Sequence, residues 1–226
     1  MAKSSGSTRG KMPSSNPQMK GAGNITKQTD HDKNHVWGID KVDERQVYIM
    51  QMTGVDESTA ARYDEAIQAF TGVKYKKIRR AYREMRERFK SEEEYLKYKK
   101  YSDLIEDFIS KSPKWHGGVT FRGVNSDKST WDKVGYGEVV NMRGMASWST
   151  NINFASGFNN GEVVYRCSKP QNGTSVNAIS KHAGEMEVLT SGRCRYKVVN
   201  KEIVYSQFQR KNFYFIDVEP IANAKK

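Results

Sequence analysis

The sequence predicts an α+β fold in which a helical lobe precedes a β core. Between residues 58 and 109 the apolar side chains recur at intervals of three and four, the period of amphipathic helices. After Trp115 the chain changes to short β-rich runs separated by glycine, which are typical of strands. Because the helices are collected ahead of the strands, we expect one domain, with a helical lobe at residues 37–113 and a two-sheet β core at residues 114–226.

Three helices are predicted in the lobe. The first begins near Ser58 and ends at Gly72, a residue type that commonly follows a helix. The second spans residues 74–90, and the third spans residues 92–109, ahead of Pro113. Each helix has one apolar face, which we expect to be buried against the others and against the β core.

Short β-rich segments make up the rest of the chain. They are residues 119–124, 139–140, 145–150, 162–167, 175–179, 186–189, 196–199 and 213–218. A short helical stretch at residues 152–158 interrupts them. The strands are too numerous for one small sheet, which is why we expect two packed sheets.

Positive charge is the strongest feature of the composition. The 226 residues include 38 Lys and Arg against 26 Asp and Glu, a formal net charge of +12. More than half of this excess lies within residues 74–90, a segment that contains nine basic residues and only two glutamates. This helix could present an ordinary solvated face, or it could dock an acidic partner or the phosphates of a nucleic acid.

The ends of the chain and its cysteines narrow the class of protein. Residues 1–36 are rich in Ser, Gly, Lys, Asn and Thr, so we expect a disordered basic tail. No apolar run of about 18 residues occurs, and the first residues lack the apolar segment of a secretion signal. We therefore expect no membrane partner. Two cysteines cannot form a disulfide framework, and we interpret them as reduced structural thiols.

The first motif is an arginine inside an apolar run. Arg122 lies within the strand-like segment 120–124 and is followed by Gly123. A buried guanidinium needs a partner, and its fork of donors suits phosphate oxygens. Gly123 would allow a ligand to approach the backbone closely. A structural ion pair is the alternative interpretation of Arg122.

The second motif lies where a strand passes into a short helix. Ser149, Thr150 and Asn151 bring two hydroxyls and an amide to this junction. Such residues commonly cap a helix. Their alternative role is to hold a neighbouring catalytic group by a hydrogen bond.

The third motif is a pair of glutamates, Glu185 and Glu187. On a strand, residues two apart project to the same face, so both carboxylates would point together while Met186 and Val188 point into the core. Adjacent carboxylates repel each other unless a cation, a proton or a reacting substrate lies between them. The alternative is an exposed pair on a surface strand without a function.

Taken in order, these motifs resemble the Arg, Ser-Thr-Ser and Glu-x-Glu motifs of the arginine-type mono-ADP-ribosyltransferases, which include clostridial binary and C3-like toxins and phage-encoded relatives. The segment 66–78 is similar to the helix-turn-helix of that family, and residues 173–199 are similar to its C-terminal half. The resemblance covers about residues 55–220. Two departures are that Asn151 replaces the last Ser of Ser-Thr-Ser, and that Arg79 stands where toxin relatives usually have Asn.

The resemblance implies an ADP-ribosyltransferase fold with an NAD cleft, and an enzyme that cleaves the nicotinamide–ribose bond of NAD without a metal. It implies that Arg122 holds a phosphate, that Ser149 holds Glu187 toward the ribose, and that Glu187 stabilises the positive charge that develops there. The implied catalytic residues are Arg122, Ser149, Glu185 and Glu187. The implied NAD-binding residues are Tyr75, Arg122, Gly123, Ser149, Thr150, Phe158 and Glu187.

The residue type at position 185 is the basis for what the resemblance implies about the acceptor. In this family a glutamate at that position accompanies arginine acceptors, so we expect ADP-ribosylation of arginine in a target protein, with NAD hydrolysis as a side reaction. The target would be acidic or associated with nucleic acid. The resemblance is compatible with a toxin or a phage effector that modifies its host, and we expect a monomer that acts in the cytoplasm or is delivered with a virion.

Two other functions stay open at this point. The basic segment 74–90 could bring the enzyme to nucleic acid, or to a machine bound to nucleic acid, which would then be the acceptor. Alternatively, the chain could be an inactive relative that serves as a nucleic-acid-binding or virion module. The histidines nearest the motifs, His116 and His182, lack a third clustered ligand, so no metal site is predicted.

Overall fold

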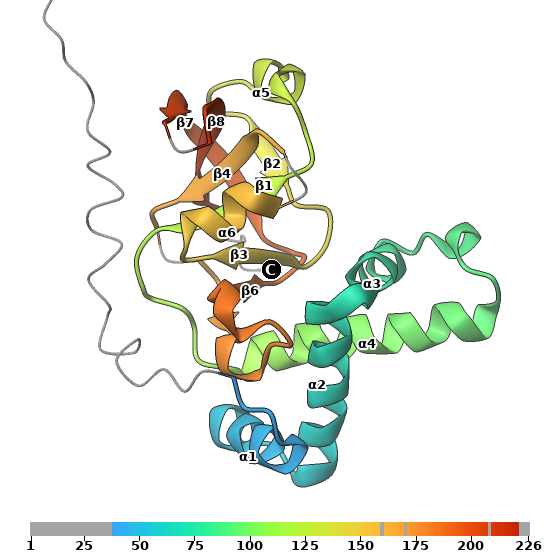
Figure 1. Cartoon of the computed structure of the whole chain (residues 1–226). Helices are drawn as coiled ribbons and strands as arrows, with labels where there is room; N and C mark the ends of the chain where they lie inside the picture. The colour runs from blue at the N-terminus through green and yellow to red at the C-terminus, as the bar shows by residue number, and fades with distance from the viewer. Residues whose placement is uncertain (1–37, 159–160, 170, 208, 222–226) are drawn as a thin grey trace, which may run out of the picture.

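The computed structural model describes residues 38–158, 161–169, 171–207 and 209–221. The tail predicted at residues 1–36 lies outside these ranges. The helices of the N-terminal half gather on one side of the molecule, and the strands gather on the other (Figure 1). The main helices of the lobe are α1 (Val42–Thr53), α2 (Glu57–Ala69), α3 (Tyr75–Tyr82) and α4 (Glu92–Lys111).

Capping side chains define where the helices begin. Asp56 accepts a hydrogen bond of 2.8 Å from the backbone N–H of Thr59 at the start of α2. Ser91 does the same for Glu94 at the start of α4, at 3.1 Å. Each bond satisfies a backbone donor that the first turn of a helix leaves without a partner. The predicted starts of these helices are therefore confirmed to within one residue.

A bend separates α2 from α3. The chain passes through one π-helical turn, η1 (Phe70–Lys74), in which Gly72 leaves the helical region with φ −96° and ψ −145°. The sequence predicts a helix end at Gly72, and the direction changes there. Helix α2 packs on α1 and α4, and after the bend α3 also packs on α4 (Figure 1).

The helix predicted over residues 74–90 is too long, because α3 ends at Tyr82. Glu84 then takes a left-handed conformation, with φ 56°, and a 3-10 turn, η2 (Arg86–Arg88), follows. The side chain of Phe89 nevertheless packs on two aromatic rings of α4, at centroid distances of 5.5 and 6.1 Å. The apolar residues of segment 74–90 are thus spaced by three and four because they are buried on both sides of the turn after Tyr82. They do not belong to one continuous helix.

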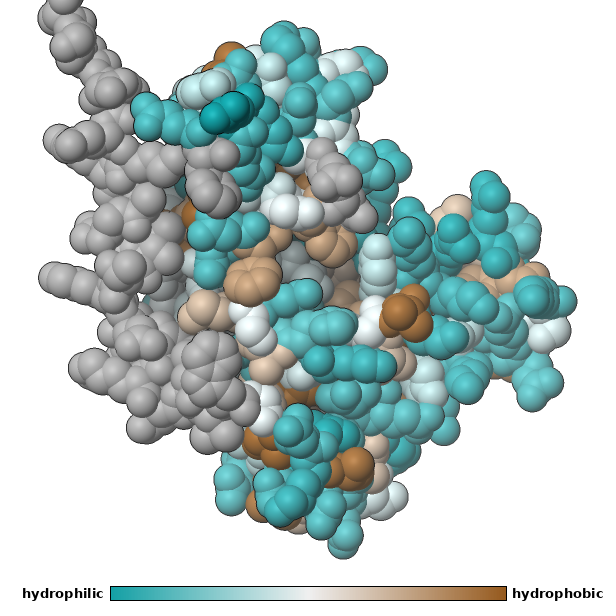
Figure 2. All heavy atoms as spheres, in the orientation of Figure 1, coloured by the Kyte–Doolittle hydropathy of each residue, from teal (hydrophilic) through white to brown (hydrophobic). Residues whose placement is uncertain are grey.

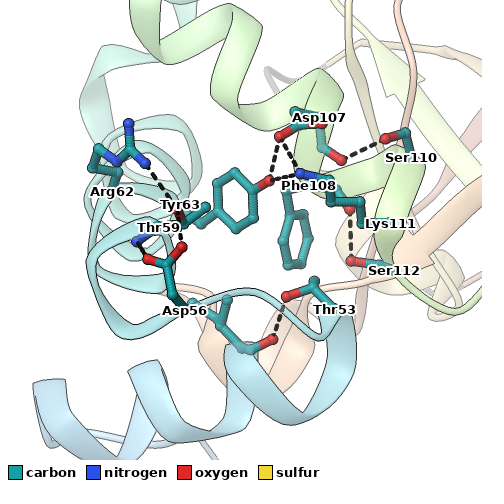
Figure 3. Close-up of polar contacts among 11 residues, drawn as sticks. Thr53, Asp56, Thr59, Arg62, Tyr63, Asp107, Phe108, Ser110, Lys111 and Ser112 are labelled. Atoms are coloured by element: carbon teal, nitrogen blue, oxygen red, sulfur yellow. Dashed lines mark hydrogen bonds and ion pairs between the residues drawn. The ribbon is translucent and has the colours of Figure 1, made fainter.

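Polar contacts between α2 and α4 close the helical lobe. The hydroxyl of Tyr63 donates a hydrogen bond to Asp107, which also accepts one from Lys111 at 2.9 Å (Figure 3). The ring of Tyr63 meets the ring of Phe108 edge to face, with centroids 5.7 Å apart. Tyr63 therefore supplies core packing and a satisfied polar end at once.

Helix α1 is absent from the sequence-based prediction, and its burial explains why. One of its two buried residues is Arg45, so the apolar period that reveals a helix is interrupted. Arg45 forms a two-point ion pair with Asp64 of α2, with N–O distances of 2.7 and 3.0 Å. Its remaining nitrogen donates to the carbonyl oxygen of Asp40 at 2.7 Å. The pair is buried and attaches α1 to α2.

Breaking this pair should destabilise the protein. We expect Asp64→Asn to lower the free energy of unfolding by about 3 kcal/mol, because it leaves Arg45 buried without a counter-charge. Asp103→Asn removes a carboxylate from an exposed pair on α4, and we expect it to cost less than about 1 kcal/mol. Urea denaturation measures both values. Equal losses in the two variants would contradict the assigned role of the buried pair.

The strands form one mixed sheet in the order β2-β7-β8-β4-β1-β3-β6-β5. Their bounds are β1 (Thr120–Val124), β2 (Val139–Asn141), β3 (Ala146–Ser149), β4 (Val163–Cys167), β5 (Gly173–Ser175), β6 (Glu187–Thr190), β7 (Arg195–Ser206) and β8 (Lys211–Pro220). Strands β4 and β8 run parallel, and the other paired strands run antiparallel.

The expected division into two packed sheets is not confirmed, since hydrogen bonds connect every described strand. The sheet is narrow at one place, however, because β1 and β3 pair only at Phe121 and Ser149. A further difference concerns the strand predicted at residues 175–179. The strand β5 is shorter and lies earlier, and Asn177–Ile179 form a 3-10 turn, η4.

One hydrophobic cluster joins the helical lobe to the sheet. It contains Ile67 of α2 and Ile105 of α4 together with Leu189 of β6. A second cluster covers another part of the sheet around Trp148 and Tyr196, and a third lies under α6 (Ile152–Gly157). No helix in the described ranges is long and apolar enough to cross a membrane.

Candidate active site

A cavity of about 270 Å³ opens between the sheet and the helical lobe. Its walls come from η1, α3, β1, β3, α6 and the start of β6. It is lined by seven of the eight site residues predicted from the sequence, namely Tyr75, Arg122, Gly123, Ser149, Phe158, Glu185 and Glu187. Segments more than 100 residues apart in the chain therefore meet at one place.

Thr150 is the predicted site residue that does not line this cavity. Its backbone N–H donates to the carbonyl oxygen of Met186 at 3.2 Å, and its side chain is only partly buried. Thr150 thus links the end of β3 to the turn that precedes β6. Asn151 caps the next helix, α6, by accepting from the backbone N–H of Asn153 at 2.9 Å.

Glu187 lies at the floor of the cavity as the first residue of β6. It is 4% exposed and pairs across the sheet with Ser149. Its carboxylate accepts a hydrogen bond from the hydroxyl of Ser180 at 3.1 Å and is also hydrogen-bonded by Ser147. The expected bond from Ser149 is replaced, because the Ser149 hydroxyl donates to the carbonyl oxygen of Glu185 at 2.7 Å.

Ser147 and Ser180 were therefore missed by sequence reasoning. Ser147 faces the same side of β3 as Ser149, two residues away, so the strand period could have indicated it. Ser180 offered no such signal, since it lies in a loop seven residues before Glu187. Its hydroxyl also accepts from the backbone N–H of His182 at 3.1 Å, so its single proton is directed to the carboxylate.

The surroundings of Glu187 favour its protonated form. Burial raises the pKa of Glu187 to about 7, and the negative charge of Glu185 acts in the same direction. The hydrogen bonds from Ser147 and Ser180 and the positive charge of Arg122 oppose this increase. A carboxylate that titrates near neutral pH in a cavity is a common property of catalytic groups.

Glu185 reaches the cavity in a different way from the one expected. It ends a 3-10 turn, η5 (Ala183–Glu185), and Met186 follows with a left-handed φ of 50°. Glu185 and Glu187 therefore do not share a strand face, and Met186 is only partly buried rather than in the core. The consequence is an asymmetric pair, with Glu185 exposed at the mouth of the cavity and Glu187 buried at its floor.

Arg122 lies on β1, and no carboxylate of the described residues pairs with it. One terminal nitrogen donates to the carbonyl oxygen of Ser147 at 2.6 Å. Its Nε is buried and has no hydrogen-bond partner among the residues that the structure describes. Burial, together with the charge of Arg79, lowers the pKa of Arg122 to about 10, so the guanidinium stays protonated at neutral pH. The alternative of a structural ion pair receives no support from these contacts.

Arg79 of α3 adds a second guanidinium to the same wall. It donates to the carbonyl oxygen of Met142, and its Nε is likewise buried without a partner within the described ranges. Burial lowers its pKa. Two partly buried cations with no carboxylate partner in the described ranges are costly unless an anion joins them, and guanidinium groups match phosphate oxygens best. The sequence marks Arg79 only as a departure from the Asn that is usual in toxin relatives, and it does not indicate that this arginine lines the site.

Aromatic side chains stand at the opening of the cavity. The rings of Tyr75 and Phe158 lie with their centroids 6.5 Å apart, and Phe158 is 44% exposed. Phe154, which also lines the cavity, is 46% exposed. Exposed aromatic rings beside a cavity offer flat apolar surfaces on which a planar ring can stack.

Gly123 is required by the packing of α6. A Cβ atom at this position would lie 1.8 Å from the carbonyl oxygen of Ala155. Gly123 was expected to let a ligand approach the backbone closely. In the structure it lets α6 pack closely against β1. Its backbone still lines the cavity.

We expect Gly123→Ala to lower the free energy of unfolding by about 2 kcal/mol, because α6 must move away from β1. The matched control is Gly157→Ala on α6, where an added Cβ meets no atom within 4 Å. Thermal or urea denaturation compares the two variants. If Gly123→Ala were as stable as Gly157→Ala, the close contact between β1 and α6 would not constrain the site.

No group of three His, Cys, Asp or Glu residues that could hold a metal ion occurs in the part of the chain that the structure describes. The candidate site thus consists of a buried carboxylate, an exposed carboxylate, two guanidiniums without carboxylate partners and aromatic rings. It can hold an anionic group next to a place where positive charge is stabilised.

The fold is that of the ADP-ribosyltransferases. No protein-family model matches the chain, and no curated protein matches it significantly. Solved structures do match. The chain is similar to Vis toxin, an ADP-ribosyltransferase from Vibrio splendidus solved in complex with agmatine, with a TM-score of 0.58 and 18% identity over 80% of this chain and 84% of that one.

Two further solved structures are similar over comparable lengths. Exoenzyme S from Pseudomonas aeruginosa, solved bound to carba-NAD, has a TM-score of 0.55 and 17% identity, and the match covers 81% of this chain and 90% of that one. An ADP-ribosyltransferase from Clostridium botulinum has a TM-score of 0.54 and 16% identity, with 81% of this chain and 96% of that one covered. The fold that the sequence motifs imply is therefore confirmed.

Proposed function

We propose that the protein is a mono-ADP-ribosyltransferase that transfers ADP-ribose from NAD to arginine side chains of a target protein and releases nicotinamide. One observation carries the proposal: Arg122, Ser149 and the two glutamates converge on a single cavity of an ADP-ribosyltransferase fold. The four residues come from three separate motifs, so a chance match to one motif does not account for them.

The guanidiniums without carboxylate partners account for how the protein would hold NAD. Arg122 and Arg79 present buried donors that a pyrophosphate can accept, which also compensates their burial. Tyr75 and Phe158 offer rings for stacking at the opening, and the backbone of Gly123 would lie against the nicotinamide amide. Solved Exoenzyme S bound to carba-NAD shows that this fold can hold an NAD analogue.

Glu187 is placed to stabilise the transition state. Breaking the bond between nicotinamide and ribose leaves positive charge on the ribose, and a buried carboxylate stabilises such a charge far more than water does. Ser147 and Ser180 hold this carboxylate in place. Ser149 does not donate to it. Instead, Ser149 fixes the backbone of Glu185, and through it the turn between the two glutamates.

Glu185 would act on the acceptor. A guanidinium has a pKa above about 12, so an arginine can attack only if a carboxylate docks it and accepts a proton. Glu185 lies exposed at the mouth, where a side chain of another protein can reach it. The solved complex of Vis with agmatine, itself a guanidinium compound, supports a guanidinium acceptor for a protein of this fold.

The titration of Glu187 predicts how the activity depends on pH. If the ionised carboxylate is required, kcat/KM should rise about tenfold per pH unit below 7 and level off above about pH 8. Ser180→Ala removes a hydrogen bond that lowers this pKa, so its rising limb should move to higher pH. Nicotinamide release between about pH 5 and pH 9 measures both profiles. An unchanged limb in Ser180→Ala would contradict the assigned hydrogen bond.

A direct experiment tests the proposed function. The protein is incubated with labelled NAD and a bacterial lysate, and mass spectrometry identifies the modified residue. We expect modification of arginine in a protein, compatible with the role of a toxin or a phage effector that acts as a monomer in the cytoplasm of its host. Modification only of other residues, or of nucleic acid, would contradict the specificity.

A further inference from the structure

A second hollow adjoins the candidate active site and is strongly basic. This groove has a volume of about 480 Å³ and lies between α3, the end of β1 and the segment that follows β2. It shares Tyr75, Arg79, Arg122, Gly123 and Phe158 with the cavity, so the two are continuous. A ligand whose reacting bond lies in the cavity can therefore extend into the groove.

The groove is lined by six basic side chains and by no carboxylate within the described ranges. These are Lys76, Arg79, Arg80, Arg83, Arg122 and Arg143. Arg79 and Arg122 are the pair that faces both hollows, whereas Lys76, Arg83 and Arg143 are exposed at the rim of the groove. The rim therefore holds positive charge beyond the two arginines that the pyrophosphate of NAD would neutralise.

The same segment carries basic residues outside the groove, and several of these are already paired. Lys77 forms an ion pair with Glu94, and Arg86 forms one with Glu92 at 2.6 Å. Both partners belong to α4, so the side of the segment that faces α4 is partly neutralised. The surface of this lobe is mainly hydrophilic on the face that Figure 2 shows. Within the described ranges, the four basic residues of the segment that line the groove form no ion pair with a carboxylate, whereas Lys77, Arg86 and Arg88 outside it do.

We propose that the groove binds a third phosphate, carried on the adenosine ribose of the dinucleotide, and that the protein therefore prefers NADP to NAD. A phosphate monoester adds a charge of about −1.5 to −2 at pH 7, which is opposite in sign to the excess at the rim and smaller than it. In other dinucleotide sites an arginine accommodates this 2′-phosphate. The proposal rests on the proposed function, because it concerns the nucleotide of that same site.

A nucleic acid is the other source of phosphates, and the charge distribution favours it less. A strand that tracks along a protein needs positive charge over several nucleotides. Here the pairs with Glu92 and Glu94 interrupt the positive surface beyond the groove. A phosphate held next to the reacting dinucleotide needs only the groove itself.

The test is calorimetric titration of NAD and of NADP into the full chain carrying Glu187→Gln, which keeps the nucleotide intact. We expect NADP to bind about tenfold more tightly than NAD at low salt, and this ratio to fall as salt is raised. Arg143→Gln and Arg80→Gln should each reduce the ratio by about threefold or more. Arg86→Gln removes the same charge from an exposed pair outside the groove and should leave the ratio unchanged.

The outcomes separate this proposal from the proposed function. Binding of NAD with equal or weaker binding of NADP would overturn the third-phosphate site alone. Binding of neither nucleotide, in this variant and in the unsubstituted chain, would overturn both. A short single-stranded oligonucleotide provides the last outcome. If it bound to the protein, bound more weakly to Arg143→Gln, and the protein showed no preference for NADP over NAD, the groove would be a nucleic-acid site and the proposal would be wrong.

Discussion

Glu187→Gln should reduce the release of nicotinamide from NAD by about 10³-fold, both with and without an acceptor. The substitution keeps the size of the side chain and an oxygen that can accept the hydrogen bond from Ser180, but it removes the charge that would stabilise the ribosyl cation. Because this charge acts before any acceptor attacks, hydrolysis and transfer should be lost together. Nicotinamide release at the rate of the unsubstituted protein would show that Glu187 is not the catalytic carboxylate.

The same variant should also be more stable, and this distinguishes a lost charge from a damaged fold. The pKa of Glu187 is raised from 4.5 to about 7 in the folded protein, so keeping this carboxylate ionised opposes folding at high pH. The contribution of Glu187 to stability should be fully present below about pH 4.5 and should be lost as the pH rises through 7. At about pH 8, Glu187→Gln should therefore gain up to about 3 kcal/mol over the unsubstituted protein, and almost nothing at about pH 4.5. Denaturation at both pH values measures the difference.

Glu185→Gln should separate the two halves of the reaction. Transfer of ADP-ribose to arginine should fall by at least about 100-fold, because no carboxylate would dock the guanidinium and accept its proton. NAD hydrolysis should persist, since Glu187 and the two arginines remain in place. Parallel assays of nicotinamide release and of label incorporated into an arginine-containing protein measure the two activities.

A matched control for Glu185→Gln is Glu93→Gln, which removes an exposed carboxylate from α4, away from the cavity. We expect it to change neither activity. Equal loss of hydrolysis and transfer in Glu185→Gln would assign both glutamates to the breaking of the NAD bond. Full retention of arginine transfer would remove Glu185 from acceptor recognition.

Much of this site could be predicted from the sequence because the motifs keep their order and spacing. Arg122, Ser149, Glu185 and Glu187 needed no knowledge of tertiary contacts, and all four line one cavity. The positions of the two glutamates relative to each other could not be predicted from the sequence. The left-handed residue Met186 moves Glu185 off the strand, and a period of two cannot reveal such a turn.

The residues that the sequence did not indicate act through contacts between distant segments. Ser180 is defined by its hydrogen bond to Glu187, and Arg79 is defined by a buried Nε that has no hydrogen-bond partner among the described residues. Helix α1 was missed for a similar reason, because its buried face includes Arg45, whose partner Asp64 lies on another helix. In each case the role of the polar residue can be inferred only when its hydrogen-bond or ion-pair partner, or the lack of one, is known.

Incubation of the protein with NAD and agmatine, followed by mass spectrometry of the products, tests the central claim most directly. The cavity should break the bond between nicotinamide and ribose and join ADP-ribose to the guanidinium. We therefore expect free nicotinamide together with ADP-ribosylated agmatine, with both products lost in Glu187→Gln. Absence of both products across the neutral and alkaline pH range, or their undiminished formation by Glu187→Gln, would contradict it.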